Sequence, residues 1–223
     1  MNFFEKYTNS KFYYIVDQIF RIFLINVLTL ITLIIGLGIF GLGPAIIAST
    51  LTTKMIYEKH EGPIAKVYFQ IVKKYFVKSL AITLFFLVLI GIFIFNIVFF
   101  FNSLEVEYTL LGLIGIFLMT ILLFLSVSSY VHALMMLAFY QENPIFKLIK
   151  NGFILTAGFI IRSLIFSILT FGLIILSVVI PILGLLLLFF LESSITYWCM
   201  LKAYKKVPNF DDRDNEMLNS IIY

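Results

Sequence analysis

Four polar residues lie within long apolar stretches of this sequence and could form a site for a proton or a solute. Glu192 lies near the middle of the last stretch, beside Ser193, Ser194, Thr196 and Tyr197. An ionisable group at the centre of a bilayer costs on the order of 2.5–3.5 kcal/mol on insertion scales, so it is a candidate for function. We expect Glu192 to form a polar site with His132 or Asn26. Arg162, which begins its helix close to the membrane surface, completes the candidate set.

A second interpretation of Glu192 is structural. The carboxyl group could be paired or protonated and serve only to fix the packing of its helix. Proton relays generally contain several acids in a chain, and Glu192 is the one acid deep in an apolar stretch. The residues alone leave both interpretations open.

The sequence contains few residues that would indicate an enzyme. His60 and His132 lie in different segments and do not form a metal-binding HExxH motif, and no serine lies in a G-x-S-x-G motif. The single cysteine, Cys199, excludes an intrachain disulfide and a cysteine metal cluster. Residues 36–41 match the GxGxxG motif of dinucleotide-binding sites, but they lie within an apolar run, whereas that motif requires a βαβ unit. We therefore expect no enzymatic activity, no cofactor, no metal site and no nucleic-acid partner.

Composition places these residues in a lipid bilayer. Hydrophobic residues make up 62% of the 223 positions and charged residues 13%, with a mean hydropathy of +1.08. Soluble domains are about 45–50% apolar and about 25% charged. Uncharged runs long enough to cross a hydrocarbon core of about 30 Å cover residues 22–53, 79–104, 108–141 and 163–191. We expect one all-α integral membrane domain over residues 1–223.

Glycine and proline divide two of these runs. Gly36, Gly38, Gly41, Gly43 and Pro44 cluster in the first run and disfavour a continuous helix, so we expect a hairpin whose second helix begins at Pro44. Pro181 divides the last run in the same way. The expected spans are 17–38, 44–58, 79–101, 108–138, 160–180 and 182–202. The alternative is five spans, with residues 22–53 crossing once.

The distribution of charge favours six spans. All 16 Lys and Arg residues lie in segments 1–21, 54–78, 142–162 and 202–223, and the intervening connections contain none. Because Lys and Arg in short loops remain on the cytoplasmic side, both termini and the tail 203–223 are expected there. Five spans would place Lys6, Lys11 and Arg21 on the opposite face.

Two basic segments and one row of small residues offer contact surfaces. Within the expected cytoplasmic segments 59–78 and 141–159, lysines alternate with aromatic residues, as in amphipathic helices that lie in the membrane interface. Small side chains recur every fourth residue at Gly41, Ala45, Ser49 and Thr53. Such a row allows helices to approach closely. We expect it to pack against other helices rather than to line a substrate path.

Several short motifs resemble the YesL-like family of bacterial membrane proteins. The sequence Asn26-Val27-Leu28, followed by Gly41-Leu42-Gly43-Pro44-Ala45, is similar to the NLL…IGPA pattern that opens the family. The likeness continues at Glu61-Gly62, Phe69, residues 72–76 (VKKYF) and Lys150-Asn151. Tyr75 stands where the family usually has Asn, and Gly41 where Thr is common, so these two departures leave the subfamily open.

The resemblance implies a role but no active site. The family is a domain of unknown function whose members are often encoded beside genes for carbohydrate uptake. This implies a non-enzymatic accessory or assembly partner of an ABC-type sugar importer in the bacterial cytoplasmic membrane, with permease subunits as partners. The resemblance also implies that four residues are structural determinants of the first hairpin: Asn26, Gly43, Pro44 and Ala45. A transporter or lipid-interacting protein with a polar site at Glu192 is the alternative.

Overall fold

The computed structural model describes residues 11–60, 62–106, 109–207 and 210–222, and every regular element in them is helical. The elements are α2 (Lys11–Ile35), α3 (Ile39–Tyr57), α4 (Ile64–Val106), α5 (Leu110–Phe139), α6 (Ile145–Gly158), α7 (Ile160–Val179), α8 (Pro181–Thr196), the π-helix η1 (Tyr197–Leu201), α9 (Lys202–Tyr204) and α10 (Phe210–Ile222). Six helical stretches in these residues are long and apolar enough to cross a membrane. The prediction of an all-α membrane protein is confirmed.

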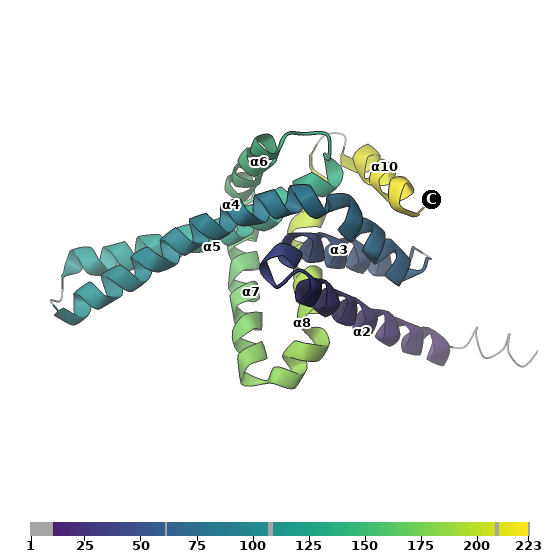
Figure 1. The fold of residues 1–223 in the computed structure, drawn as a ribbon, viewed down its shortest axis with the longest axis horizontal. Coiled ribbons are helices and arrows are strands. Elements are labelled where there is room, and N and C mark those ends of the chain that lie inside the picture. Colours follow the sequence, from purple (N-terminus) through teal and green to yellow (C-terminus); the bar gives the residue numbers. More distant parts are fainter. Residues whose placement is uncertain (1–10, 61, 107–108, 208–209, 223) are drawn as a thin grey trace, which may run out of the picture.

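The helices form three hairpins that point in different directions (Figure 1). α4 and α5 make a long antiparallel pair that projects away from the other helices, and α7 and α8 make a second pair that runs downward in the view. α2 and α3 form the third pair, and α3 lies at the centre of the molecule, in contact with α2, α4 and α8. The short helices α6 and α10 lie near the inner ends of α4 and α5.

The first hairpin turns earlier than the sequence suggested. Gly38 N–H donates to Leu33 O (2.7 Å) and Leu37 N–H donates to Ile34 O (3.1 Å), which is the Schellman pattern at a helix end. Leu37 (φ 50°) and Gly38 (φ 76°) complete the reversal with left-handed backbone. α3 therefore begins at Ile39, and Pro44, the expected first residue, lies inside the helix.

Two of the glycines expected in the turn, Gly41 and Gly43, serve instead to pack α3 between its neighbours. A Cβ atom on Gly41 would lie 2.4 Å from the carbonyl oxygen of Thr32 on α2. A Cβ atom on Gly43 would lie 2.4 Å from Thr83 Oγ1 and 2.9 Å from Ser79 O on α4. Only glycine allows both backbone contacts. Pro44 and Ala45 are also buried, as are Ser49 and Thr53 of the row of small residues.

The two basic segments differ in structure. Residues 64–78 are the first part of α4, which runs without a break to Val106, so they do not form a separate helix before the span. The second basic segment contains a distinct helix, α6, which is separated from α7 at Phe159 (φ −114°, ψ 38°). Tyr108, the expected start of the fourth span, lies outside the described residues.

A buried ion pair attaches α10 to α3. Lys54 is 2% exposed, and its ammonium group lies 2.6 Å from Asp214 Oδ1 and 2.9 Å from Glu58 Oε2. Phe210 of α10 is also buried, with its ring against Phe139 of α5 and Tyr204 of α9. Burial raises the pKa of Asp214, and the Lys54 ammonium only partly offsets that rise. The neighbouring Glu58 carboxylate adds to the rise.

We predict that Gly43→Ala destabilises the protein by about 1–3 kcal/mol, because the new methyl group would overlap the backbone of α4. Gly91→Ala is the matched control, since a Cβ atom there meets no atom within 4 Å. Unfolding of both variants in detergent micelles, followed by circular dichroism, measures the difference. Equal stabilities would contradict the close approach of α3 and α4.

We predict that Lys54→Met destabilises the protein by about 3–5 kcal/mol, because it leaves the Asp214 and Glu58 carboxylates without their cation. The double variant Lys54→Met/Asp214→Leu should recover most of this loss, since apolar replacements often stabilise as well as a buried ion pair does. Lys59→Met, at an exposed position, is the control. Chemical unfolding measures all three variants. A double variant no more stable than Lys54→Met would contradict the explanation that the loss of stability comes from the unpaired Asp214 carboxylate.

Candidate functional site

One face of α7 carries a row of hydroxyl groups. Ser163, Ser167 and Thr170 are spaced four and three residues apart, which places them on the same side of the helix. All three are buried. Two of the candidate residues identified from the sequence, His132 and Glu192, contact this row from neighbouring helices.

His132 lies on α5 and is bonded at both ring nitrogens. Its Nδ1 lies 2.5 Å from Tyr204 Oη, and its Nε2 lies 3.2 Å from Ser163 Oγ. A neutral imidazole has one donor and one acceptor nitrogen, so both of its hydrogen-bonding positions are occupied. The side chain is 1% exposed. It therefore joins α5 to α7 and to α9.

The serines of α5 extend this contact deeper along α7. Ser128 Oγ donates to Ser163 O (2.7 Å) and lies 2.7 Å from Ser167 Oγ. Ser167 Oγ in turn donates to Phe124 O (2.8 Å). α5 and α7 are therefore linked by hydrogen bonds over two helical turns.

Glu192 on α8 contacts the deepest hydroxyl of the row. Thr170 Oγ1 lies 3.1 Å from both carboxylate oxygens of Glu192. Within the described residues no cation lies within ion-pair distance of this carboxylate. Arg162 lies at the start of α7, about two turns before Thr170, which contacts Glu192. No ion pair joins Arg162 to Glu192 in the described residues.

The side chain of Asn26 hydrogen-bonds to the backbone of α8. Its Oδ1 accepts hydrogen bonds from the backbone N–H groups of Phe189 (3.0 Å) and Phe190 (3.3 Å) on α8. Its amide group donates to Ile22 O (2.9 Å) within α2. The side chain is 1% exposed. Asn26 therefore joins α2 to the backbone of α8, two residues before Glu192.

A π-helix positions the partner of His132. η1 follows α8 directly and widens the helix over five residues, which changes the direction of the side chains after it. Such insertions are frequent at functional sites. Tyr197 at its start stacks on Tyr57 of α3, with ring centroids 5.0 Å apart. The widened turn leads to Tyr204, which is fully buried against His132.

The sequence alone did not identify Ser163, Thr170 or Tyr204 as part of the site. Ser163 and Thr170 could have been found from the sequence, because together with Ser167 they recur at the spacing of one helix face. No sequence pattern indicated Tyr204, since the orientation of its side chain depends on the π-helix. The sequence analysis expected Glu192 to form a polar site with His132 or Asn26. In the described residues Glu192 and His132 each contact the hydroxyl row of α7, and no hydrogen bond joins the two to each other.

The chemistry available here is hydrogen bonding and proton exchange between hydroxyl, imidazole and carboxyl groups. Both nitrogens of His132 and both carboxylate oxygens of Glu192 contact other side chains of the chain. No three His, Cys, Asp or Glu side chains among the described residues come together as a metal-ion site. The arrangement is that of a polar cluster which holds α5, α7, α8 and α9 together.

Comparison with known proteins gives one match. Residues 22–97 match a family described as "Protein of unknown function, DUF624". The matched segment includes most of α2, all of α3 and the greater part of α4, about a third of the chain. No curated protein and no solved structure matches the chain.

We predict that Tyr204→Phe destabilises the protein by about 1–3 kcal/mol, because it leaves a buried nitrogen of His132 without its partner. Tyr14→Phe, at a position 53% exposed, is the control and should change stability by less than about 0.5 kcal/mol. Thermal unfolding in micelles compares the two variants. Equal stabilities would show that the hydrogen bond between Tyr204 and His132 contributes nothing.

Proposed function

We propose that this chain is a YesL-like, non-enzymatic protein of the bacterial cytoplasmic membrane that acts as an accessory or assembly partner of an ABC-type carbohydrate importer. The partner in this proposal is a permease subunit. The match of residues 22–97 to a family of unknown function supports the family assignment. The resemblance of the motifs supports the association with carbohydrate uptake.

The observation that carries the proposal is the uncovered outer half of the α4–α5 hairpin. This part of the pair projects beyond the other helices (Figure 1). Its exposed residues include many large aromatic side chains: Phe95, Phe99, Phe101 and Phe117. Lipid alone can cover such a surface, but the surface is also apolar, and these four side chains are more than half exposed within the part of the chain that the structure describes. It is therefore the surface to which we assign a partner helix.

Two surfaces suggested by the sequence fit the partner role less well. The row Gly41, Ala45, Ser49 and Thr53 is buried inside the chain, where it packs α3. Lys54, the first residue of the Lys-rich segment 54–78, is buried in its ion pair. The exposed part of that segment is the face of α4 with Lys66, Lys73 and Lys74. These lysines suit anionic headgroups of the inner leaflet, which supports a cytoplasmic location for both termini.

The polar cluster favours an accessory role over transport. A transport site needs polar groups that a solute can reach and bind, whereas His132 and Glu192 are occupied by partners within the chain. The same cluster supports the structural interpretation of Glu192. In the proposal, the cluster stabilises the inner ends of the helices, and the α4–α5 hairpin provides the contact surface.

A photo-crosslinking amino acid at Phe95 or Phe117 tests the proposal in the native membrane. These side chains are 70% and 69% exposed on the outer hairpin. We predict crosslinks to an ABC permease subunit from both positions, identified by mass spectrometry after mild solubilisation. Val179, which is 70% exposed at the end of α7, is the matched control and should give lipid adducts only. Lipid adducts alone from all three positions would contradict the proposal.

A second candidate function is transport or lipid handling through the polar cluster. The hydroxyl row on α7, which connects the surroundings of His132 to Glu192, is the observation that favours it. Glu192→Gln separates the two candidates, because the amide still accepts a hydrogen bond from Thr170 but has no charge. Flux of solute or lipid in reconstituted vesicles that is lost in this variant would support transport. If the protein is an accessory partner, the Glu192→Gln variant should bind the permease subunit as the unchanged protein does.

A further inference from the structure

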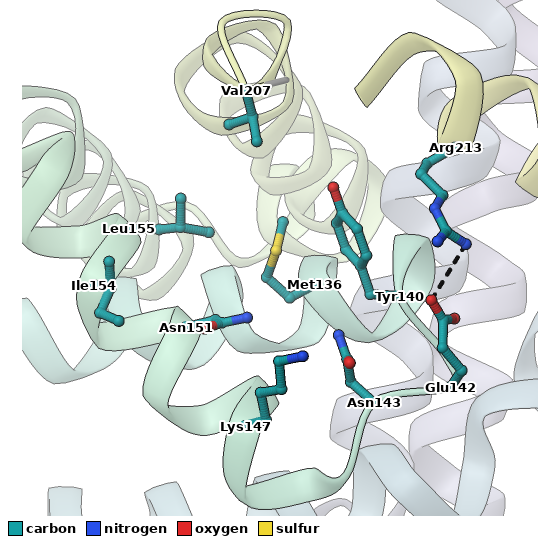
Figure 2. A pocket seen from close by; sticks show the side chains of 10 residues that line it. All are labelled: Met136, Tyr140, Glu142, Asn143, Lys147, Asn151, Ile154, Leu155, Val207 and Arg213. Atoms are coloured by element: carbon teal, nitrogen blue, oxygen red, sulfur yellow. Dashed lines mark ion pairs between the residues drawn. The ribbon is translucent and has the colours of Figure 1, made fainter. Parts of the chain in front are cut away.

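A cavity of about 480 Å³ opens between the end of α5, the start of α6 and α10. Figure 2 shows the side chains around it. They come from two parts of the chain, residues 136–155 and 207–213: Met136, Tyr140, Glu142, Asn143, Lys147, Asn151, Ile154, Leu155, Val207 and Arg213. The volume lies within the range of about 300–1,000 Å³ found for small-molecule sites.

Hydrogen-bond donors dominate the polar part of the cavity wall. In Figure 2 the ammonium group of Lys147 and the side chains of Asn143 and Asn151 turn toward the same space. Among the described residues, no acidic side chain pairs with Lys147. An ammonium group and two amides without an anionic partner favour a ligand rich in acceptor oxygens.

The only carboxylate on the wall is already engaged. Glu142 Oε1 lies 3.2 Å from Arg213 Nη1, and the guanidinium group of Arg213 lies 5.6 Å from the ring centroid of Tyr140. These contacts hold Arg213 at one side of the cavity. Arg213 also lies 3.5 Å from Glu216 Oε2 of α10, outside the lining, so the charge of Arg213 is offset by two carboxylates. The positive charge that the cavity offers to a ligand is therefore that of Lys147, which no acidic side chain among the described residues pairs. Such a charge favours an anion.

The remainder of the wall is apolar. Met136, Ile154, Leu155 and Val207 contribute hydrocarbon surface beside the donors. The cavity also lies where α5, a candidate span, ends and α6 begins. Phe146 and Ile154 of α6 are 80% and 54% exposed, which is typical of a helix that lies in the membrane interface. A ligand that fits both parts of the wall has an anionic group joined to a hydrocarbon chain.

We propose that this cavity binds the phosphate group of an anionic membrane lipid, with Lys147, Asn143 and Asn151 as donors to the phosphate oxygens. The first carbons of the lipid contact Met136 and Leu155. Basic pockets between helices on the cytoplasmic side bind such headgroups in other membrane proteins. This site is separate from the partner surface on α4 and α5, so it does not depend on the proposed permease partner.

Native mass spectrometry of the full-length protein in micelles tests the site with added phosphatidylglycerol or phosphatidylcholine. We expect selective retention of phosphatidylglycerol, weakened about fivefold by Lys147→Gln. Lys150→Gln is the matched control, because Lys150 is exposed on the same helix but does not line the cavity. Asn143→Ala keeps every charge and removes one donor from a loop, and it should also weaken retention.

Each result decides a part of the proposal. Equal losses of phosphatidylglycerol retention in Lys147→Gln and Lys150→Gln, with no loss in Asn143→Ala, would overturn the proposed site. Such a result would indicate general attraction of the anionic lipid to a basic surface. Equal retention of the two lipids would overturn the need for an anion. Displacement of the lipid by millimolar inorganic phosphate would confirm the anion site and overturn the lipid as its source. Crosslinking at Phe95 reports on the permease independently of these outcomes.

Discussion

The fold depends on how closely the backbone of α3 approaches α2 and α4. Gly41 and Gly43 are two residues apart and so face different sides of the helix, and each lies against backbone atoms of a neighbour. In a bilayer, lipid tails are as apolar as leucine, so helices associate through packing and hydrogen bonds rather than by burying apolar surface from water. Glycine contributes most to such packing because it brings backbones together. The positions of α2, α4 and α8 are set by their contacts with α3.

Polar side chains provide the second set of connections, and each joins particular helices. Asn26 connects α2 to the backbone of α8, His132 connects α5 to α7 and α9, and Lys54 connects α3 to α10. A polar group within a membrane must find a partner inside the protein, because lipid offers none. Each group therefore fixes the register and the direction of approach of two elements, which apolar contacts alone do not specify. This accounts for the burial of so many hydroxyl groups in a chain of low polarity.

The sequence predicted the number of membrane-crossing helices well, because uncharged runs and glycine or proline breaks are local properties. It placed the first turn too late, since Leu37 adopts the left-handed backbone that glycine favours and nothing in its side chain indicates this. In residues 64–78 lysines alternate with aromatic residues, as in an interfacial helix. α4 nevertheless runs on from these residues into the span, because the sequence contains no proline or glycine between residue 64 and Gly91. The partners of His132 could not be predicted, because the π-helix that orients Tyr204 is a consequence of packing. The burial of Lys54 depends on α10, which is 160 residues away in sequence.

The unbroken length of α4 has a mechanical consequence. At roughly 1.5 Å per residue the helix is about 65 Å long, more than twice the thickness of the hydrocarbon core. Near Ser79 and Thr83 it rests against the backbone of α3, and Tyr68, Ile71 and Tyr75 in its first turns are buried in the core. One end of the helix is therefore fixed, and the other end extends into the outer hairpin. A bilayer whose thickness does not match the length of the outer part is accommodated by tilt or bending of that part, while the first turns remain in place.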